Sequence, residues 1–233
     1  MKILAIGAHP DDLEIFCFGT LMAWRTMGAD LALAIATDGA AGGDLPPEDL
    51  ARSRRAEAIE GAKALRTTPE FLDFPDGALI ADAALISTLG RLIAVERPDL
   101  VVTHSPNCYH ADHRALSVAV SQAVSFRAPL LVMDTLAGTG FQPTIWVDVT
   151  PHWPAKEQAI MCHQSQDPAR FVEAANRQAA FRASECNQPT TARAEAFRFD
   201  PRFPFADIRN LLPPAPSTTS PAQKGLLRPR PKI

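Results

Sequence analysis

Histidine and aspartate side chains are concentrated in two short stretches of the sequence. The first stretch runs from Gly7 to Glu14, reads GAHPDDLE and contains His9, Asp11 and Asp12. Neighbouring carboxylates repel each other and add nothing to an apolar core, so their charge should be compensated at this position. The stretch directly follows an apolar run, which makes a group of polar side chains there still less expected from packing alone.

Three interpretations of this first stretch compete. One aspartate could cap the following helix, which is worth about 1 kcal/mol but leaves the second aspartate unexplained. The two carboxylates could instead share a proton as a general acid–base dyad. In the third interpretation, His9 and one aspartate bind a divalent cation while the other aspartate stays free as a base. The first stretch alone does not decide among them.

The second stretch offers further side chains of the same kind. It reads HADH and contains His110, Asp112 and His113. Zinc binds imidazole nitrogens and carboxylate oxygens, and catalytic zinc sites usually combine three protein ligands with a water. The alternative is that Asp112 caps a helix and the histidines lie on a solvated turn. Because each stretch lies beyond the carboxyl end of an expected strand, the two together favour a metal site.

Expected strands and helices alternate along most of the chain. The strands are expected at 2–8, 30–37, 70–74, 99–104, 129–135 and 144–150, and the helices at 13–27, 46–65, 82–96, 110–124, 156–164 and 169–185. This alternation predicts an α/β fold that is Rossmann-like, with a mostly parallel, twisted sheet and helices on both faces. Ligands of such sheets bind beyond the carboxyl ends of the strands, where both stretches and the glycine-rich loop 38–44 would lie. No dinucleotide or P-loop fingerprint follows the first strand.

Composition bounds the domain organisation and the partners. The chain has 233 residues, is 46% hydrophobic and carries a net charge of −3. We expect one domain over residues 1–211 and a mobile, proline-rich tail over 212–233. No basic cluster suits nucleic acid, and no apolar stretch suits a membrane span or a signal peptide. The cysteines form no C-x-x-C pair, so we expect reduced thiols and a cytoplasmic protein, and the sequence leaves a homo-oligomer open.

The two stretches together resemble a known family. AHPDDLE and YHADHR are similar to motifs of the PIG-L/LmbE-like zinc-dependent N-deacetylases, with further similarity in TDGAAGG, RRAEA, RPDLVVTH and KEQAIMCHQSQ. The resemblance covers about residues 1–170. It implies an enzyme that removes an N-acyl group, most often acetyl, from a small-molecule amino sugar or glycoconjugate. The alternatives within this resemblance are an amidase acting on a thiol conjugate and a metal-dependent hydratase.

Transferred residue by residue, the resemblance implies roles for five side chains. One Zn²⁺ per chain would be held by His9, Asp12 and His113, with another divalent metal as the alternative. Asp11 matches the general base, and His110 matches a second catalytic histidine that stabilises the oxyanion or protonates the leaving amine. Zinc lowers the pKa of a bound water from about 16 to about 7. One aspartate would therefore bind the metal while its neighbour accepts the proton of the water.

Other residues are expected around this centre. Asp112 would hydrogen-bond a histidine and fix its tautomer. The candidates for substrate binding are Arg54, Arg55, Tyr109 and His163. The alternative for the two arginines is a solvated helix face, and the alternative for His163 is a structural hydrogen bond.

The chain departs from the family pattern at two positions. The loop that reads T-x-G-E in the family reads TDGA here, with Ala40 in place of the acid. Cys108 stands two residues before His110, where some relatives carry a tyrosine that contacts the oxyanion. Tyr109, the only tyrosine of the chain, lies one residue later.

Overall fold

A sheet of seven strands forms the centre of the protein. The computed structural model describes residues 1–218 and 220. The strands are β1 (Lys2–Gly7), β2 (Asp30–Thr37), β3 (Glu70–Phe74), β4 (Leu100–Thr103), β5 (Leu130–Met133), β6 (Ile145–Asp148) and β7 (Ala194–Phe199). They lie in the order β3-β2-β1-β4-β5-β7-β6. β7 is antiparallel to both of its neighbours, and the other pairs are parallel.

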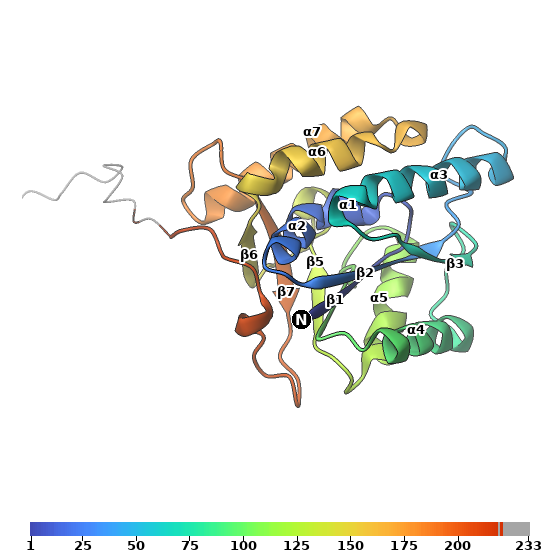
Figure 1. The fold of residues 1–233 in the computed structure, drawn as a ribbon, viewed down its shortest axis with the longest axis horizontal. Helices are drawn as coiled ribbons and strands as arrows, with labels where there is room; N and C mark the ends of the chain where they lie inside the picture. The colour runs from blue at the N-terminus through green and yellow to red at the C-terminus, as the bar shows by residue number, and fades with distance from the viewer. Residues whose placement is uncertain (219, 221–233) are drawn as a thin grey trace, which may run out of the picture.

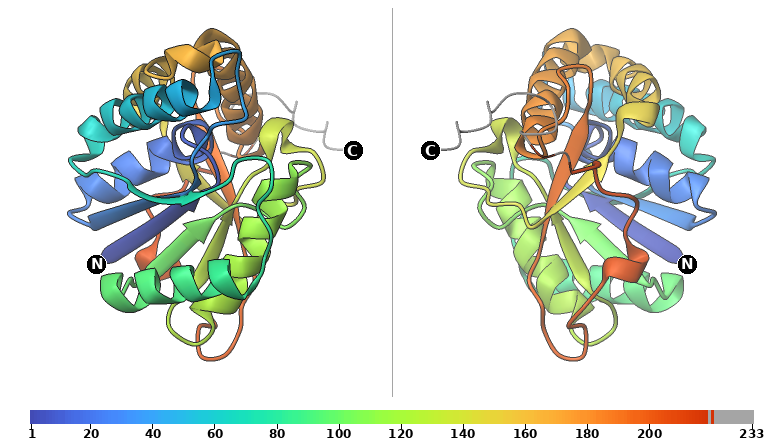
Figure 2. Two further views of the ribbon diagram at one scale, coloured as in Figure 1. Left: turned by 90° about the vertical axis from the view of Figure 1, so that its right-hand side faces the viewer. Right: turned by 90° about the vertical axis from the view of Figure 1, so that its left-hand side faces the viewer.

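Helices cover both faces of the sheet (Figures 1 and 2). The α-helices are α1 (Asp12–Phe16), α2 (Phe18–Thr26), α3 (Pro47–Ala62), α4 (Ala83–Glu96), α5 (Ala111–Val124), α6 (Trp153–Met161) and α7 (Pro168–Glu185). Short 3-10 helices are η1 (Lys63–Leu65), η2 (Leu136–Gly138), η3 (Thr150–His152), η4 (Gln164–Gln166) and η5 (Arg209–Leu211). α4 and α5 lie on one face, and the other five α-helices lie on the opposite face (Figure 1).

The central strands are buried on both sides, which explains their continuous apolar sequences. Along β1, Ile3 and Ala5 belong to the apolar cluster on the face of α1, α2, α6 and α7. Leu4 and Ile6 belong to the cluster on the face of α4 and α5. Parallel strands with helices on both faces have this pattern. The predicted fold class, a mostly parallel α/β sheet, is confirmed.

The structure divides the single helix expected at 13–27 into two. The break lies at Cys17, whose φ of −143° is not helical. Glu195 of β7 supplies the reason, since its carboxylate accepts the N–H groups of Gly19 (3.0 Å) and Thr20 (2.8 Å) at the start of α2. A side chain at Gly19 would not fit, because a Cβ atom there would lie 2.6 Å from Val149. A distant carboxylate therefore caps α2, and no local sequence signal reveals it.

Sequence analysis did not anticipate β7. This strand inserts between β5 and β6, where it pairs with both in the antiparallel sense. Five of its six residues are buried. The strand lies after the alternating part of the chain and pairs with strands distant in sequence, so its place in the sheet depends on tertiary contacts.

The chain continues to contact the domain beyond residue 211. Pro213 and Pro216 are buried, and the N–H of Asp148 donates to the carbonyl of Pro214 at 3.0 Å. The rest of the expected tail, from residue 221 on, lies outside the described residues. Within the described part of the chain, every helix is too short or too polar to cross a bilayer.

Candidate metal and active site

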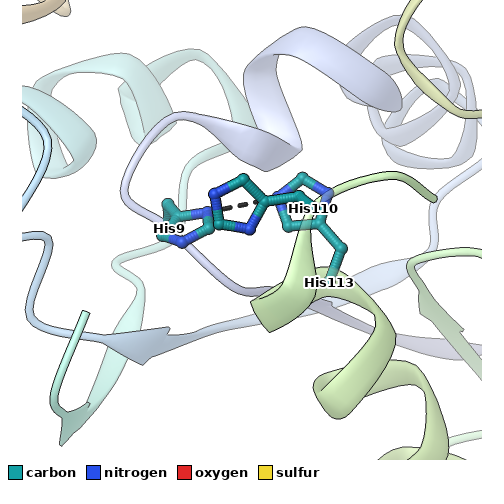
Figure 3. A group of neighbouring side chains, drawn as sticks. All are labelled: His9, His110 and His113. Atoms are coloured by element: carbon teal, nitrogen blue, oxygen red, sulfur yellow. Dashed lines mark hydrogen bonds between the residues drawn. The ribbon is translucent and has the colours of Figure 1, made fainter. Parts of the chain in front are cut away.

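The carboxyl ends of β1 and β4 bring the two histidine–aspartate stretches together. From β1 the chain proceeds to β2 and β3 on one side, whereas β4 and β5 lie on the other, so the strand order reverses between β1 and β4. Such a switch point is the usual ligand site of an open α/β sheet. Figure 3 shows His9 from the turn after β1 facing His110 and His113 from the start of α5. Nδ1 of His9 lies 3.2 Å from Nε2 of His113.

Three side chains place their donor atoms at nearly equal separations. Asp12 Oδ2 lies 3.3 Å from Nδ1 of His9, and Asp12 Oδ1 lies 3.2 Å from Nε2 of His113. Zinc has bonds of about 2.0–2.1 Å to nitrogen, so neighbouring ligand atoms of a tetrahedral ion are about 3.3–3.4 Å apart. The two histidine nitrogens and the Asp12 carboxylate therefore suit zinc in type, and each pair is spaced for one ion, with a different Asp12 oxygen facing each histidine. Three sets of three side chains place one donor atom each within 4.8 Å of one another: His9, His110 and His113; Asp12, His104 and His113; and His9, Asp76 and Asp112.

The charges around these donors favour a cation. Burial works against the ionised form of Asp12, but His113, His104 and His9 hold the pKa of this carboxyl well below its usual value. Burial also works against charge on His9, yet Asp12 and the hydrogen bonds of Asp112 and other carboxylates raise the pKa of His9 to about 12. The surroundings thus stabilise positive charge at this point, whether a proton or a metal ion carries it.

Two carboxylates hold the second nitrogen of His9. Its Nε2 lies 3.2 Å from Asp112 Oδ2 and 3.2 Å from Asp76 Oδ1. Asp112 is itself fixed, since it accepts the N–H groups of Gly77 (2.8 Å) and Leu79 (3.1 Å). The structure thus places Asp112 beside a histidine, as expected. Sequence analysis missed Asp76, although its position just after β3 puts it at the same edge of the sheet.

Asp11 lies beside the donor atoms but is held by an arginine. Arg54 Nη2 lies 3.3 Å from Asp11 Oδ1, and Arg54 Nη1 donates to the carbonyl of Gly39 at 3.1 Å. Both side chains are buried. Burial raises the pKa of Asp11, and Arg54 offsets only part of this effect. A carboxylate with a raised pKa is suited to accept a proton near neutral pH.

A cavity of about 320 Å³ opens over these groups, and its lining is partly polar and partly apolar. Arg54, Asp76 and Gln166 contribute to the polar lining. The apolar lining comes from Ile15, Phe16, Leu136 and Phe171. A cavity of this size and mixed lining is typical of small-molecule sites.

The structure brings some of the expected substrate-binding residues to this cavity and not others. Arg54 lines it, and Tyr109 lies at its rim with 68% of its surface exposed. Arg55 is not among the lining residues, because its guanidinium pairs with Asp73 and lies 4.1 Å above the ring of Phe71.

His163 is likewise absent from the lining of the cavity. It is buried beside α1, where its Nε2 lies 3.6 Å from Glu14 Oε2. The structure therefore does not bring Arg55 and His163 to this cavity, and their contact with substrate stays a prediction. Their sequence signal did not indicate which way the side chains face.

Comparison with known proteins places the chain among sugar deacetylase sequences. The family model described as PIG-L, GlcNAc-PI de-N-acetylase, matches residues 4–124. The 1D-myo-inositol 2-acetamido-2-deoxy-alpha-D-glucopyranoside deacetylase of Kineococcus radiotolerans is 26% identical over 164 residues, which are 54% of this chain and 45% of that protein. The match thus spans about half the length of this curated relative.

Solved structures share the fold. The N,N'-diacetylchitobiose deacetylase of Pyrococcus horikoshii superimposes with a TM-score of 0.78 and 24% identity, over 91% of this chain and 88% of that chain. The 4-carboxy-2-hydroxymuconate hydratase of Pseudomonas putida gives a TM-score of 0.76 and 20% identity, over 86% of this chain and 97% of that chain. At these identities the likeness is one of fold. Because the family model matches more than half of the sequence, the chain belongs to the PIG-L family.

Proposed function

We propose that the protein is a zinc-dependent hydrolase that removes an N-acyl group, N-acetyl foremost, from an amino sugar or glycoconjugate. One observation carries this proposal. Nδ1 of His9 and Nε2 of His113 lie 3.2 Å apart, each within 3.3 Å of a carboxylate oxygen of Asp12, in the lining of a cavity that also includes the buried carboxylate of Asp11. Membership of the PIG-L family supports it, as does a relative named as a deacetylase of an acetamido sugar.

In this proposal His9, Asp12 and His113 hold the metal. Two imidazoles and one carboxylate suit zinc, and another divalent metal is the alternative. When bound, the ion supplies Lewis-acid chemistry that polarises an amide carbonyl and lowers the pKa of a water. With Nδ1 of His9 turned to the ion, its Nε2–H donates to Asp112, which fixes the tautomer of the ring.

Asp11 is assigned the proton transfer from the water, and His110 a hydrogen bond to the substrate. Asp11 accepts the proton of the attacking water, and Arg54 keeps its carboxylate in place. His110 Nδ1 accepts the N–H of Asp112 at 3.3 Å, so the neutral ring carries its proton on Nε2. Burial and the neighbouring charge of His9 lower the pKa of His110, which favours this neutral ring. Its Nε2–H can therefore donate a hydrogen bond to the developing oxyanion, whereas protonating the leaving amine would require the imidazolium form that the lowered pKa disfavours.

The polar and the apolar lining residues of the cavity suit different parts of such a substrate. Arg54 and Asp76 can hydrogen-bond sugar hydroxyl groups, and Tyr109 can cover a sugar that reaches the rim. Phe16 and Phe171 offer an apolar surface for an acyl or aglycone group. The loop position that is acidic in the family is Ala40 here, and Asp76 is the acid that lines the cavity besides Asp11 and Asp12.

An amine-release assay tests the proposed function. The zinc-loaded protein is incubated with a panel of N-acetylated amino sugars and glycoconjugates, and free amine is measured. We expect release by the unaltered protein and its loss in Asp11→Asn. Asp73→Asn is the matched control, since Asp73 pairs with Arg55 outside the cavity and its positive φ of 56° also suits asparagine.

Two outcomes would contradict the proposal. One is the absence of amine release across the panel by a protein that binds zinc. The other is an equal loss of activity in both variants. Water addition to a carbon–carbon double bond without amine release would favour the hydratase alternative, and amine release from thiol conjugates alone would favour the amidase alternative.

A further inference from the structure

Each of the two proposed histidine ligands has a second ring nitrogen, and the partners of these nitrogens differ in kind. Nε2 of His9 faces the carboxylates of Asp76 and Asp112. Nδ1 of His113 faces a thiol instead, since Sγ of Cys108 lies 3.2 Å away. Cys108 is only 3% exposed, so water competes little for this contact.

The backbone around Cys108 holds the thiol in place. Its N–H donates to the carbonyl of Ser105 at 3.2 Å, which closes a turn after β4. Its carbonyl accepts from Nη1 of Arg114 at 2.9 Å, which ties the turn to the first turn of α5. Since His113 lies on the same turn of α5, sulfur and imidazole belong to one fixed unit.

The direction of the hydrogen bond follows from the chemistry of imidazole. Nε2 of His113 lies 3.2 Å from both Asp12 Oδ1 and Nδ1 of His9, so it faces the proposed cation. A neutral imidazole that offers the lone pair of Nε2 to a metal carries its proton on Nδ1. That N–H then points at the sulfur of Cys108, which accepts it.

We propose that Cys108 is a positioning residue of the metal site. It accepts the Nδ1–H of His113 and thereby fixes the tautomer and the ring orientation with which His113 binds the ion. This inference rests on the ligand set given under the proposed function. Hydrogen-bond partners of metal-binding histidines commonly contribute 10–100-fold to metal affinity, and we expect about tenfold here because sulfur is a weak acceptor.

Zinc affinity measured by competition with a chromophoric chelator tests this role without any substrate. We expect Cys108→Ala to bind zinc about tenfold more weakly. Cys108→Ser should stay close to the unaltered protein, because its hydroxyl oxygen can still accept the Nδ1–H. Cys186→Ala is the matched control, since Cys186 lies at the end of α7 and does not line the cavity, and its affinity should be unchanged.

A second variant and a spectroscopic measurement distinguish the loss of the hydrogen bond from a general folding defect. Cys108→Val also lacks an acceptor but adds volume where Cys108→Ala removes it, so an equal loss of affinity in both variants would point to the missing acceptor and not to packing. In long-range ¹H–¹⁵N spectra of the zinc-loaded protein, the Nδ1–H of His113 should exchange slowly with solvent when residue 108 is cysteine or serine. It should exchange faster when residue 108 is alanine or valine.

The outcomes separate this inference from the proposed function. Equal zinc affinity in the unaltered protein, Cys108→Ala and Cys108→Val would overturn the role of Cys108 and leave the ligand set standing. Weaker binding in Cys108→Ser to the same extent as in Cys108→Ala would also overturn it, because the acceptor would then not matter. Failure of the unaltered protein to bind zinc would instead refute the ligand set itself.

Discussion

Replacing Lys156 with methionine should destabilise the protein strongly, because it breaks a buried ion pair. Nζ of Lys156 lies 2.5 Å from Oε1 of Glu195, and the two side chains are 2% and 4% exposed. Lys156 also donates to the carbonyl of Ile15 at 2.8 Å. Glu195 accepts two N–H groups at the start of α2, so the pair joins α1, α2, α6 and β7 at one point. The cavity wall formed by Ile15 and Phe16 depends on this junction.

The size of the effect follows from what each substitution leaves behind. Removing one partner of a buried ion pair typically costs about 3–5 kcal/mol, since the remaining charge is uncompensated. In a chain of this size 1 kcal/mol corresponds to a shift of about 2–4 °C in Tm, so Lys156→Met should lower Tm by about 6–20 °C. Glu195→Gln should cost a similar amount. The double variant should cost less than the sum of the two, because no buried charge is left without a partner.

Thermal and urea unfolding of the metal-free protein measures these differences. Arg177→Met is the matched control, because Arg177 forms an ion pair with Glu173 on the exposed side of α7. Such exposed pairs are worth about 0.5 kcal/mol or less. A Lys156→Met variant no less stable than this control would refute the reasoning, as would full additivity in the double variant.

Three further predictions concern single side chains. Asp11→Asn should keep its zinc but lose turnover about 10²–10⁴-fold, because it removes the base and no ligand; metal analysis and initial rates check this, and loss of zinc would contradict it. Arg55→Ala should leave turnover unchanged, because Arg55 contacts Asp73 and Phe71 outside the cavity. A large fall in the initial rate would show that Arg55 contributes to the active site. Asp82→Ala should lower the free energy of unfolding in urea by about 1 kcal/mol, because Oδ1 of Asp82 accepts the N–H of Leu85 at the start of α4 (2.9 Å). An unchanged urea midpoint would show that this cap contributes little.

The sequence predicted those elements whose signals lie within the element itself, such as an apolar run or a capping side chain. The apolar run of β1 marks a strand buried on both faces, and Asp82 marks the start of α4 through its cap. The break at Cys17 and the strand β7 depend instead on contacts between distant segments. Glu195 caps α2 from β7, so neither feature has a signature within its own stretch of sequence.

The candidate site divides in the same way. The two histidine–aspartate stretches follow strand ends, and the topology of the sheet is enough to bring them together. Side-chain direction is harder to predict, as Arg54 and Arg55 show, because adjacent residues of a helix face different sides. Asp76 was missed because a lone aspartate after a strand is an ordinary loop residue until His9 is placed beside it.

Anomalous diffraction at the zinc edge from zinc-loaded crystals tests the central claim most directly. The account predicts one ion per chain, bound by Nδ1 of His9, a carboxylate oxygen of Asp12 and Nε2 of His113 at about 2.0–2.2 Å. Asp11 should lie near the ion without binding it. An ion held by other side chains, or one bound by Asp11 in place of Asp12, would contradict the account.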